Sequence, residues 1–104
     1  MTTELHDYIL NDRSKGIIFV STFDNWTNIY LSDFDSIYQK KHGSLVRHKQ
    51  TGKEFVLVRV NESIDNCRGR KSSHIIIDHR LSDEVIEKHI LPLLCGINRK
   101  VEIF

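Results

Sequence analysis

The sequence predicts one α/β domain spanning residues 1–104, built as a small two-layer or three-layer sandwich around a mostly parallel sheet. Short, continuous apolar runs at residues 16–21 and 75–77 are typical of strands buried on both faces, and we expect these two strands to be neighbours at the centre of the sheet. After each run, apolar residues recur every three or four positions, which is typical of an amphipathic helix. The expected order is strand, helix, three strands, helix, strand, with an antiparallel hairpin at the sheet edge.

The first helix is expected to begin after residue 24 or 25 and to run to Gly43, with an apolar stripe over residues 23–38. Asp24 or Asn25 can cap its start, and Gly43, which follows three basic residues, supplies a stop. Its apolar stripe is expected in the core rather than on an exposed aromatic surface. The stripe consists of Phe23, Trp26, Tyr30, Phe34, Ile37 and Tyr38.

Two strands are expected next, at residues 45–48 and 54–60, joined by the turn residues 49–53 into an antiparallel hairpin. In the second strand Val56, Val58 and Val60 share one face, and residues 61–73 form a polar loop.

The second helix is expected to begin after Ser82, whose side chain can serve as the N-cap. Pro92 lacks a backbone donor, so the helix should end or kink there. Gly96 then turns the chain into a last strand at residues 101–103.

Composition restricts the class of protein. Apolar residues make up 39% and charged residues 28% of the chain, which predicts a folded domain, and the net charge of +1 argues against a surface wholly devoted to nucleic acid or membrane. Residues 1–14 are polar and lack the signal-peptide pattern. No apolar run approaches the ~20 residues of a membrane span. Cys67 and Cys95 are expected as free thiols, and the expected compartment is the cytoplasm.

The sharpest local feature is Ile-Ile-Ile-Asp-His at residues 75–79, preceded by Arg-Gly-Arg at residues 68–70. This resembles the middle portion of a P-loop ATPase core of the phage DNA-packaging (terminase) and helicase kind. The resemblance covers residues 16–94 as a pattern of elements and residues 68–79 as a motif. It implies that Asp78 corresponds to the metal-holding acid of that family.

Two departures separate the sequence from this family. No Gly-x-x-x-x-Gly-Lys-Ser/Thr loop occurs, and His79 stands where the family has the Glu that activates water. The resemblance therefore implies a non-hydrolysing relative or fragment. The competing interpretation, which we favour, is a buried strand that simply ends in a turn Asp.

Catalytic and metal-binding sets are incomplete. On a strand, His74 and Asp78 would lie about 13 Å apart on one face, with His79 on the other. Cys67 and Cys95 have neither zinc-binding spacing nor the local signature of a cysteine hydrolase. We therefore predict no catalytic residue, no metal and no cofactor.

Basic residues form the remaining signal. They cluster in the hairpin and in the loop before residue 75, and together they could hold an acidic surface if the two regions meet. The predicted binding residues are Arg47, Lys49, Lys53, Arg68, Arg70 and Lys71.

The leading functional hypothesis is a non-enzymatic binding module, a small phage or bacterial accessory or inhibitor protein that contacts a protein partner. The alternative is a nucleic-acid-binding protein, or a degenerate P-loop protein linked to DNA metabolism or packaging. A third hypothesis, a cysteine-dependent enzyme using Cys67, has no supporting motif. Homo-oligomers through the hairpin or through residues 101–104 are a further expectation.

Overall fold

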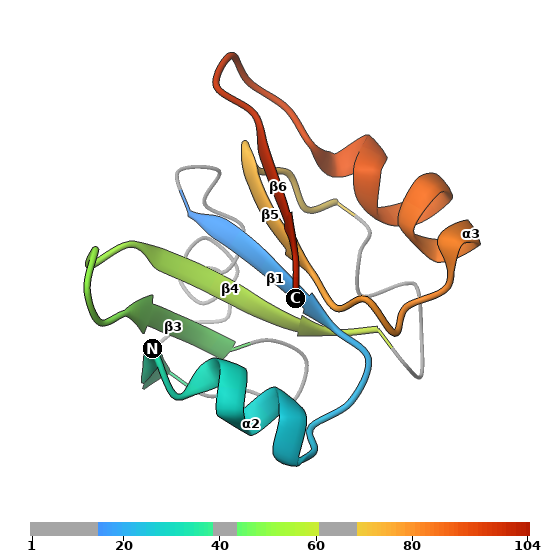
Figure 1. The fold of residues 1–104 in the computed structure, drawn as a ribbon. Helices are drawn as coiled ribbons and strands as arrows, with labels where there is room; N and C mark the ends of the chain where they lie inside the picture. The colour runs from blue at the N-terminus through green and yellow to red at the C-terminus, as the bar shows by residue number, and fades with distance from the viewer. Residues whose placement is uncertain (1–14, 39–43, 61–68) are drawn as a thin grey trace.

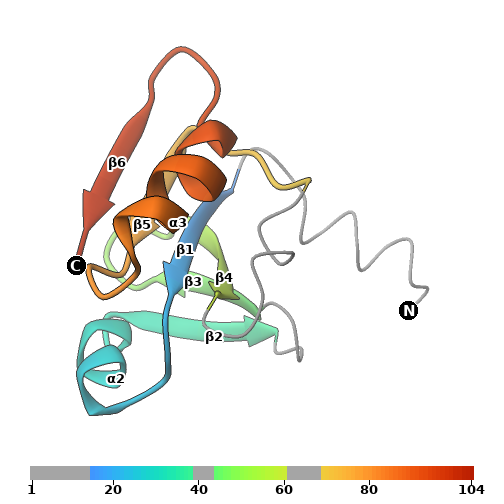
Figure 2. The same cartoon turned by 90° about the vertical axis from the view of Figure 1, so that its right-hand side faces the viewer.

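The computed structural model describes residues 15–38, 44–60 and 69–104, which form a six-stranded mixed sheet and two helical segments (Figures 1 and 2). The strand order across the sheet is β2-β3-β4-β1-β5-β6. The strands are β1 (Gly16–Val20), β2 (Phe34–Tyr38), β3 (Ser44–His48), β4 (Glu54–Arg59), β5 (His74–Ile77) and β6 (Lys100–Ile103). The helical segments are α2 (Asn25–Leu31) and α3 (Asp83–Val85), the latter continuing through η2 (Ile86–Ile90) and η3 (Leu91–Leu93).

The sheet is parallel in one part only. Strands β4, β1, β5 and β6 run parallel, and the predicted neighbours β1 and β5 are indeed paired. Strands β3 and β2 extend the sheet by antiparallel pairing, β3 with β4 and β2 with β3. The β3–β4 hairpin is confirmed, but it lies inside the sheet because β2 forms the edge that we had assigned to the hairpin. The prediction of a mostly parallel sheet is therefore correct in part.

Strand β1 is the centre of the core, because all five of its residues are buried. Its alternate side chains enter two separate apolar layers. Ile17 and Phe19 pack on the face covered by α3 and η2, together with the predicted valine face of β4. Ile18 and Val20 pack on the opposite face, which α2 covers. The fold is thus a three-layer sandwich.

The first helix is shorter than the sequence indicates. It begins after the N-cap Asp24, whose carboxylate accepts a hydrogen bond from the Thr27 backbone N–H at 2.9 Å, and it ends at Leu31. The prediction that the helix continues through residue 38 is wrong, since Phe34–Tyr38 is strand β2 and pairs with β3. The spacing of its apolar residues fits either structure, and pairing with β3 decides the outcome. Gly43 lies outside the described residues.

The aromatic stripe is split between core and surface. Tyr30 and Phe34 pack against the α2-face core as predicted. Phe23, Trp26 and Ile37 are 42%, 38% and 42% exposed, so the prediction that the whole stripe is buried is wrong.

The second helical segment follows the sequence signals closely. The Ser82 side chain caps its start by accepting a hydrogen bond from the Val85 N–H. The segment tightens into the 3₁₀ turn η3, which contains Pro92, and Gly96 then turns the chain with φ at +95°. In the described parts of the chain, no helix has the length and apolar character needed to cross a membrane.

Gly16 is required by a close approach between β1 and β4. A Cβ atom there would overlap with the Phe55 ring and lie 3.2 Å from the His74 carbonyl oxygen. Because Phe55 is only 3% exposed, its ring has little room to move.

We expect Gly16→Ala to lower the free energy of unfolding by about 1–3 kcal/mol, measured by urea titration. Ile97→Ala, at a side chain 98% exposed, should change it by less than about 0.5 kcal/mol.

Candidate functional site

Asp78 lies directly after β5, at the carboxyl end of the parallel strands, and its side chain is fully buried. Ser21 donates to Asp78 Oδ2 from its backbone N–H (3.0 Å) and its hydroxyl (2.8 Å). Arg80 donates to Oδ1 from its backbone N–H and Nε, and to Oδ2 from Nη2. Asp78 therefore ties the end of β1 to the chain that follows β5.

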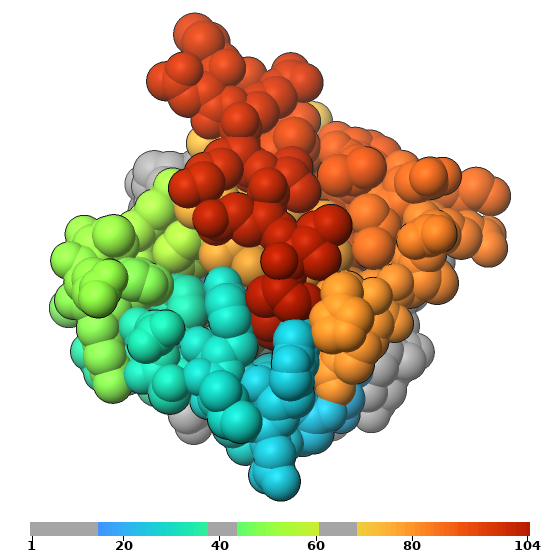
Figure 3. Space-filling view, in the orientation of Figure 1, coloured from blue at the N-terminus to red at the C-terminus, as the bar shows by residue number. Residues whose placement is uncertain are grey.

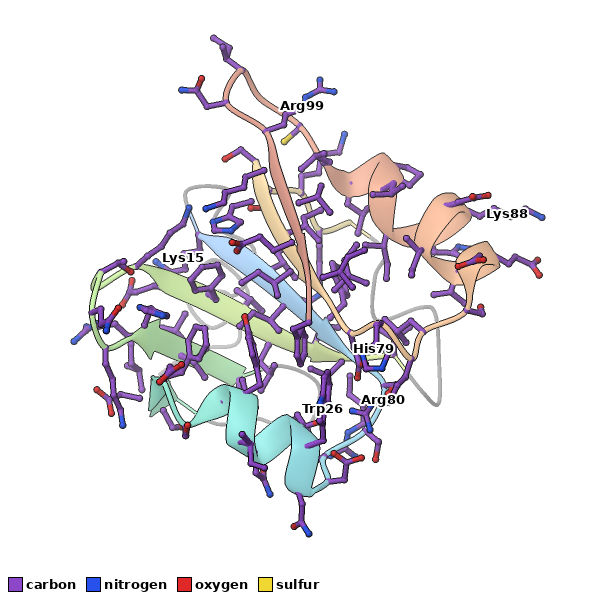
Figure 4. The ribbon with its side chains drawn as sticks, in the orientation of Figure 1. Lys15, Trp26, His79, Arg80, Lys88 and Arg99 are labelled. Carbon is purple, nitrogen blue, oxygen red and sulfur yellow. The ribbon has the colours of Figure 1, made fainter. Side chains whose placement is uncertain are left out.

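Arg80 extends this connection to helix α2. Its guanidinium forms an ion pair with Asp24, the N-cap of α2, and donates to the Thr27 hydroxyl at 2.7 Å. It also lies 4.7 Å from the centroid of the Trp26 ring. Figure 4 shows Trp26, His79 and Arg80 gathered at this end of the sheet, with Lys15 at the opposite end of β1. Arg80 thus connects the chain after β5 to α2, and Asp78 connects that chain to the end of β1.

The hydrogen bonds decide the charge of Asp78. Burial alone raises the pKa of its carboxyl, but the donors on Arg80 and Ser21 outweigh burial and lower the pKa to about 2. The carboxylate is therefore ionised at neutral pH, with both oxygens occupied. For Asp78 to hold a metal ion, as the P-loop resemblance implies, the ion would have to displace Arg80. No group of three or more His, Cys, Asp or Glu residues within the described segments is placed to share an ion.

Phe104, the residue after β6, contacts the same end of the sheet. The Phe104 carbonyl oxygen accepts a hydrogen bond from the His79 backbone N–H at 2.9 Å, and His79 Nδ1 lies 2.8 Å from it. The Phe104 ring stacks between Trp26 and Tyr30, with centroid distances of 5.1 and 3.9 Å. The position of α2 and the end of β6 therefore depend on each other.

The other end of the parallel strands, near Lys15, carries Arg47, Lys53 and the segment with Arg70 and Lys71. Glu54, at the start of β4, pairs with Lys15 (3.0 Å) and Arg47 (3.5 Å) and neutralises part of this charge. On the other side, the Ser72 hydroxyl donates to the Lys15 carbonyl, which brings the segment containing Arg70 and Lys71 to the same edge. The two basic regions thus flank one strand end. Arg68 lies outside the described residues, and Lys49 and Lys53 lie in the hairpin turn.

A hollow of about 430 Å³ opens on the α2 face beside this turn. Figure 3 shows it between the hairpin, α2 and β6. Phe55 and Ile76 line its base, and Tyr30 and Phe34 form the side next to α2. Polar and charged side chains surround this apolar surface: His48, Thr51, Lys53, His74, Lys100 and Glu102.

Charges of both signs rim the hollow. Lys53 Nζ lies 5.6 Å from the centroid of the Phe55 ring, and Lys100 lies on the opposite side, on β6. The contact of 2.8 Å with His74 holds the pKa of Glu102 below its ordinary value. Burial raises the pKa of Tyr30 to about 12, so its hydroxyl is protonated at neutral pH and can donate. The hollow therefore combines an aromatic base with two lysines, one carboxylate and a hydroxyl donor.

Sequence reasoning found part of this site. It identified Lys53 in the hairpin turn but did not connect it with residues from α2, β5 and β6. His74 and Glu102 bear on the α2 face because of the register His74↔Lys100 and Ile76↔Glu102 between β5 and β6. The alternation of Lys100 and Glu102 around Val101 was the available signal in the sequence, but the strand order is needed to place these residues beside Lys53.

Cys95 is a free thiol, and Cys67 lies outside the described residues.

The buried carboxylate makes stability depend on pH. Because Asp78 has a pKa of about 2 in the fold against an ordinary value of 3.8, its stabilisation is present at neutral pH and lost as the pH falls from about 4 toward 2. This loss should amount to about 2 kcal/mol in urea titrations at successive pH values. Asp78→Asn should cost about 2–3 kcal/mol at pH 7 and flatten this acid dependence.

The matched control is Glu84→Gln, which alters an exposed pair with Lys88 on the second helical segment. It should change stability by less than about 0.5 kcal/mol at pH 7. An Asp78→Asn protein as stable as the parent would contradict the role given to this carboxylate.

No protein-family model matches the chain, and no curated protein matches its sequence.

Proposed function

We propose that this chain is a protein-binding module whose α2-face hollow receives an apolar side chain from an acidic segment of a partner. The observation that carries the proposal is the aromatic lining of the hollow, with Phe55 at its base and Tyr30 at its side, flanked by Lys53 and Lys100. Apolar side chains inserted into such a hollow supply the energy of binding, and lysines around it select for neighbouring acidic residues.

The size of the hollow supports one inserted side chain. Its volume of about 430 Å³ is near the lower end of the range of ligand pockets. A segment with acidic residues on both sides of a Leu, Phe or Trp would place that side chain on Phe55 and its carboxylates near Lys53 and Lys100. The basic residues around Lys15 extend the positive surface along the same edge of the sheet.

Charge favours a protein over a nucleic acid as the partner. Glu102 is ionised within the rim, and Glu54 offsets Lys15 and Arg47 beside it. Both carboxylates would repel a phosphate backbone, which carries a negative charge at every nucleotide, whereas a peptide can place an uncharged residue beside them. The net charge of +1 also gives little of the long-range attraction on which nucleic-acid binding depends. Nucleic acid is therefore the alternative outcome of the experiment below.

The walls of the hollow are held before any partner arrives. Tyr30 projects from α2, which Arg80 fixes at its first turn, and His74 contacts both Glu102 and the Phe55 ring. A rigid site loses less conformational entropy on binding. A small accessory or inhibitor protein of phage or bacterial type would act in this way, by occupying an acidic surface of its target.

The test is an NMR titration of the full chain with three probes. These are an acidic peptide of alternating Glu and Leu residues with a central Trp, the same peptide with Lys in place of Glu, and a single-stranded oligonucleotide. We expect the acidic peptide to shift the amide signals of His74 and Ile76 most. Lys53→Glu should weaken its binding by about five- to tenfold, because attraction becomes repulsion beside the hollow.

Lys88→Glu is the matched control, because it makes the same change of charge at a different place. Lys88 lies on the second helical segment, away from the hairpin (Figure 4). It should leave the affinity within about twofold. Equal binding of both peptides, or binding of the oligonucleotide alone with a steep dependence on salt, would overturn the proposal.

A further inference from the structure

We propose that the chain forms a two-fold symmetric dimer in which β6 pairs antiparallel with β6 of a second copy, centred on Val101. Strand β6 is an edge of the sheet, and in Figure 2 no described element lies beyond it. Such an edge offers unpaired backbone groups to another strand. The proposed dimer shares Lys100 and Glu102 with the rim of the hollow, but it uses the backbone of the sheet edge and does not depend on the proposed function.

The backbone of β6 points the required groups outward. The Lys100 N–H donates to the Ser73 carbonyl at 2.7 Å, and the Phe104 N–H donates to the Ile77 carbonyl at 2.9 Å. In a parallel ladder alternate residues bond to the neighbouring strand, so Val101 and Ile103 direct their N–H and C=O groups away from β5. Val101 can therefore exchange two hydrogen bonds with Val101 of the second copy.

The charges on β6 select this register. In an antiparallel pair centred on Val101, Lys100 lies opposite Glu102 of the second copy, and Glu102 lies opposite its Lys100. These would be non-hydrogen-bonded positions, where Cα atoms are only about 4.5 Å apart and opposite charges interact best. A shift of the centre to Glu102 would place two carboxylates against each other. The strand is thus complementary to itself in one register.

The other face of β6 carries exposed apolar side chains. Val101 and Ile103 are 41% and 66% exposed, although their neighbours Ile75 and Ile77 on β5 are fully buried. In the proposed dimer Val101 packs against Val101 of the second copy, and Ile103 lies on the same face of the joined sheet. β-branched side chains suit such cross-strand contacts. Pairing would therefore bury apolar surface on one face and join opposite charges on the other.

The opposite edge of the sheet is less suited to pairing. The register between β2 and β3 shifts between Ser36 and Tyr38, whereas β6 keeps one register with β5 over its full length. A register shift of this kind twists a strand and interrupts its row of hydrogen-bonding groups. Self-pairing is therefore expected at β6.

The symmetry has one consequence for the hollow. A two-fold axis perpendicular to the sheet leaves the α2 faces of both copies on the same side, with Lys100 and Glu102 of each copy at the junction. The two hollows would then open on one continuous surface and could engage two segments of one partner.

Sedimentation velocity over a series of micromolar to millimolar concentrations of the full chain tests the dimer. We expect a reversible monomer–dimer equilibrium. Val101→Pro removes an outward N–H without removing a bond to β5, and proline is tolerated at such edge positions. It should raise the dissociation constant by about tenfold or more.

An exchange of charges on β6 tests the dimer without a proline substitution. Lys100→Glu and Glu102→Lys should each weaken self-association, because like charges would face each other across the axis. An equimolar mixture of the two variants should recover the association of the parent to within a few-fold, since the opposing positions are then complementary. A parent chain that remains monomeric at millimolar concentration, or a mixture no better than either variant, would overturn the inference.

Discussion

The Arg80 guanidinium is the interaction on which the arrangement of this domain depends. It forms an ion pair with the fully buried Asp78, pairs with the N-cap of α2 at Asp24, and donates to Thr27. An isolated buried carboxylate would be strongly unfavourable, but five donated hydrogen bonds satisfy this one. Because α2 has only seven residues, it would be marginal without such support. Arg80 therefore fixes a short helix against the end of β5.

Both proposed surfaces follow from that position of α2. Tyr30 on α2 forms one side of the hollow and stacks on Phe104, which leads directly from β6. The same stacking, together with the bond from His79 to the Phe104 carbonyl, sets the end of the edge strand. The hollow and the β6 edge thus share the residues Lys100 and Glu102 on one face. A partner bound in the hollow and a second copy paired at β6 would meet at these two charges.

Local signals in the sequence were sufficient for much of the fold. Continuous apolar runs identified β1 and β5 as buried neighbours, and Ser82, Pro92 and Gly96 marked the start and end of the second helical segment. The sequence could not separate α2 from β2, because aromatic residues in both satisfy helical spacing, and pairing with β3 decides between them. The basic turn that contains Lys53 was also predictable from local signals. The hollow was not, because it depends on a strand order that places residues from four distant segments together.

The most direct measurement of the central claim is amide hydrogen exchange in Arg80→Met compared with the parent chain. Methionine keeps much of the length of the side chain but removes every hydrogen bond from the guanidinium. If Arg80 holds α2 in place, amides of α2 should lose protection by at least about tenfold, while the amides of β1 and β4 remain protected. Equal protection of α2 in both proteins would contradict the account, because the helix would then be held by its apolar contacts alone.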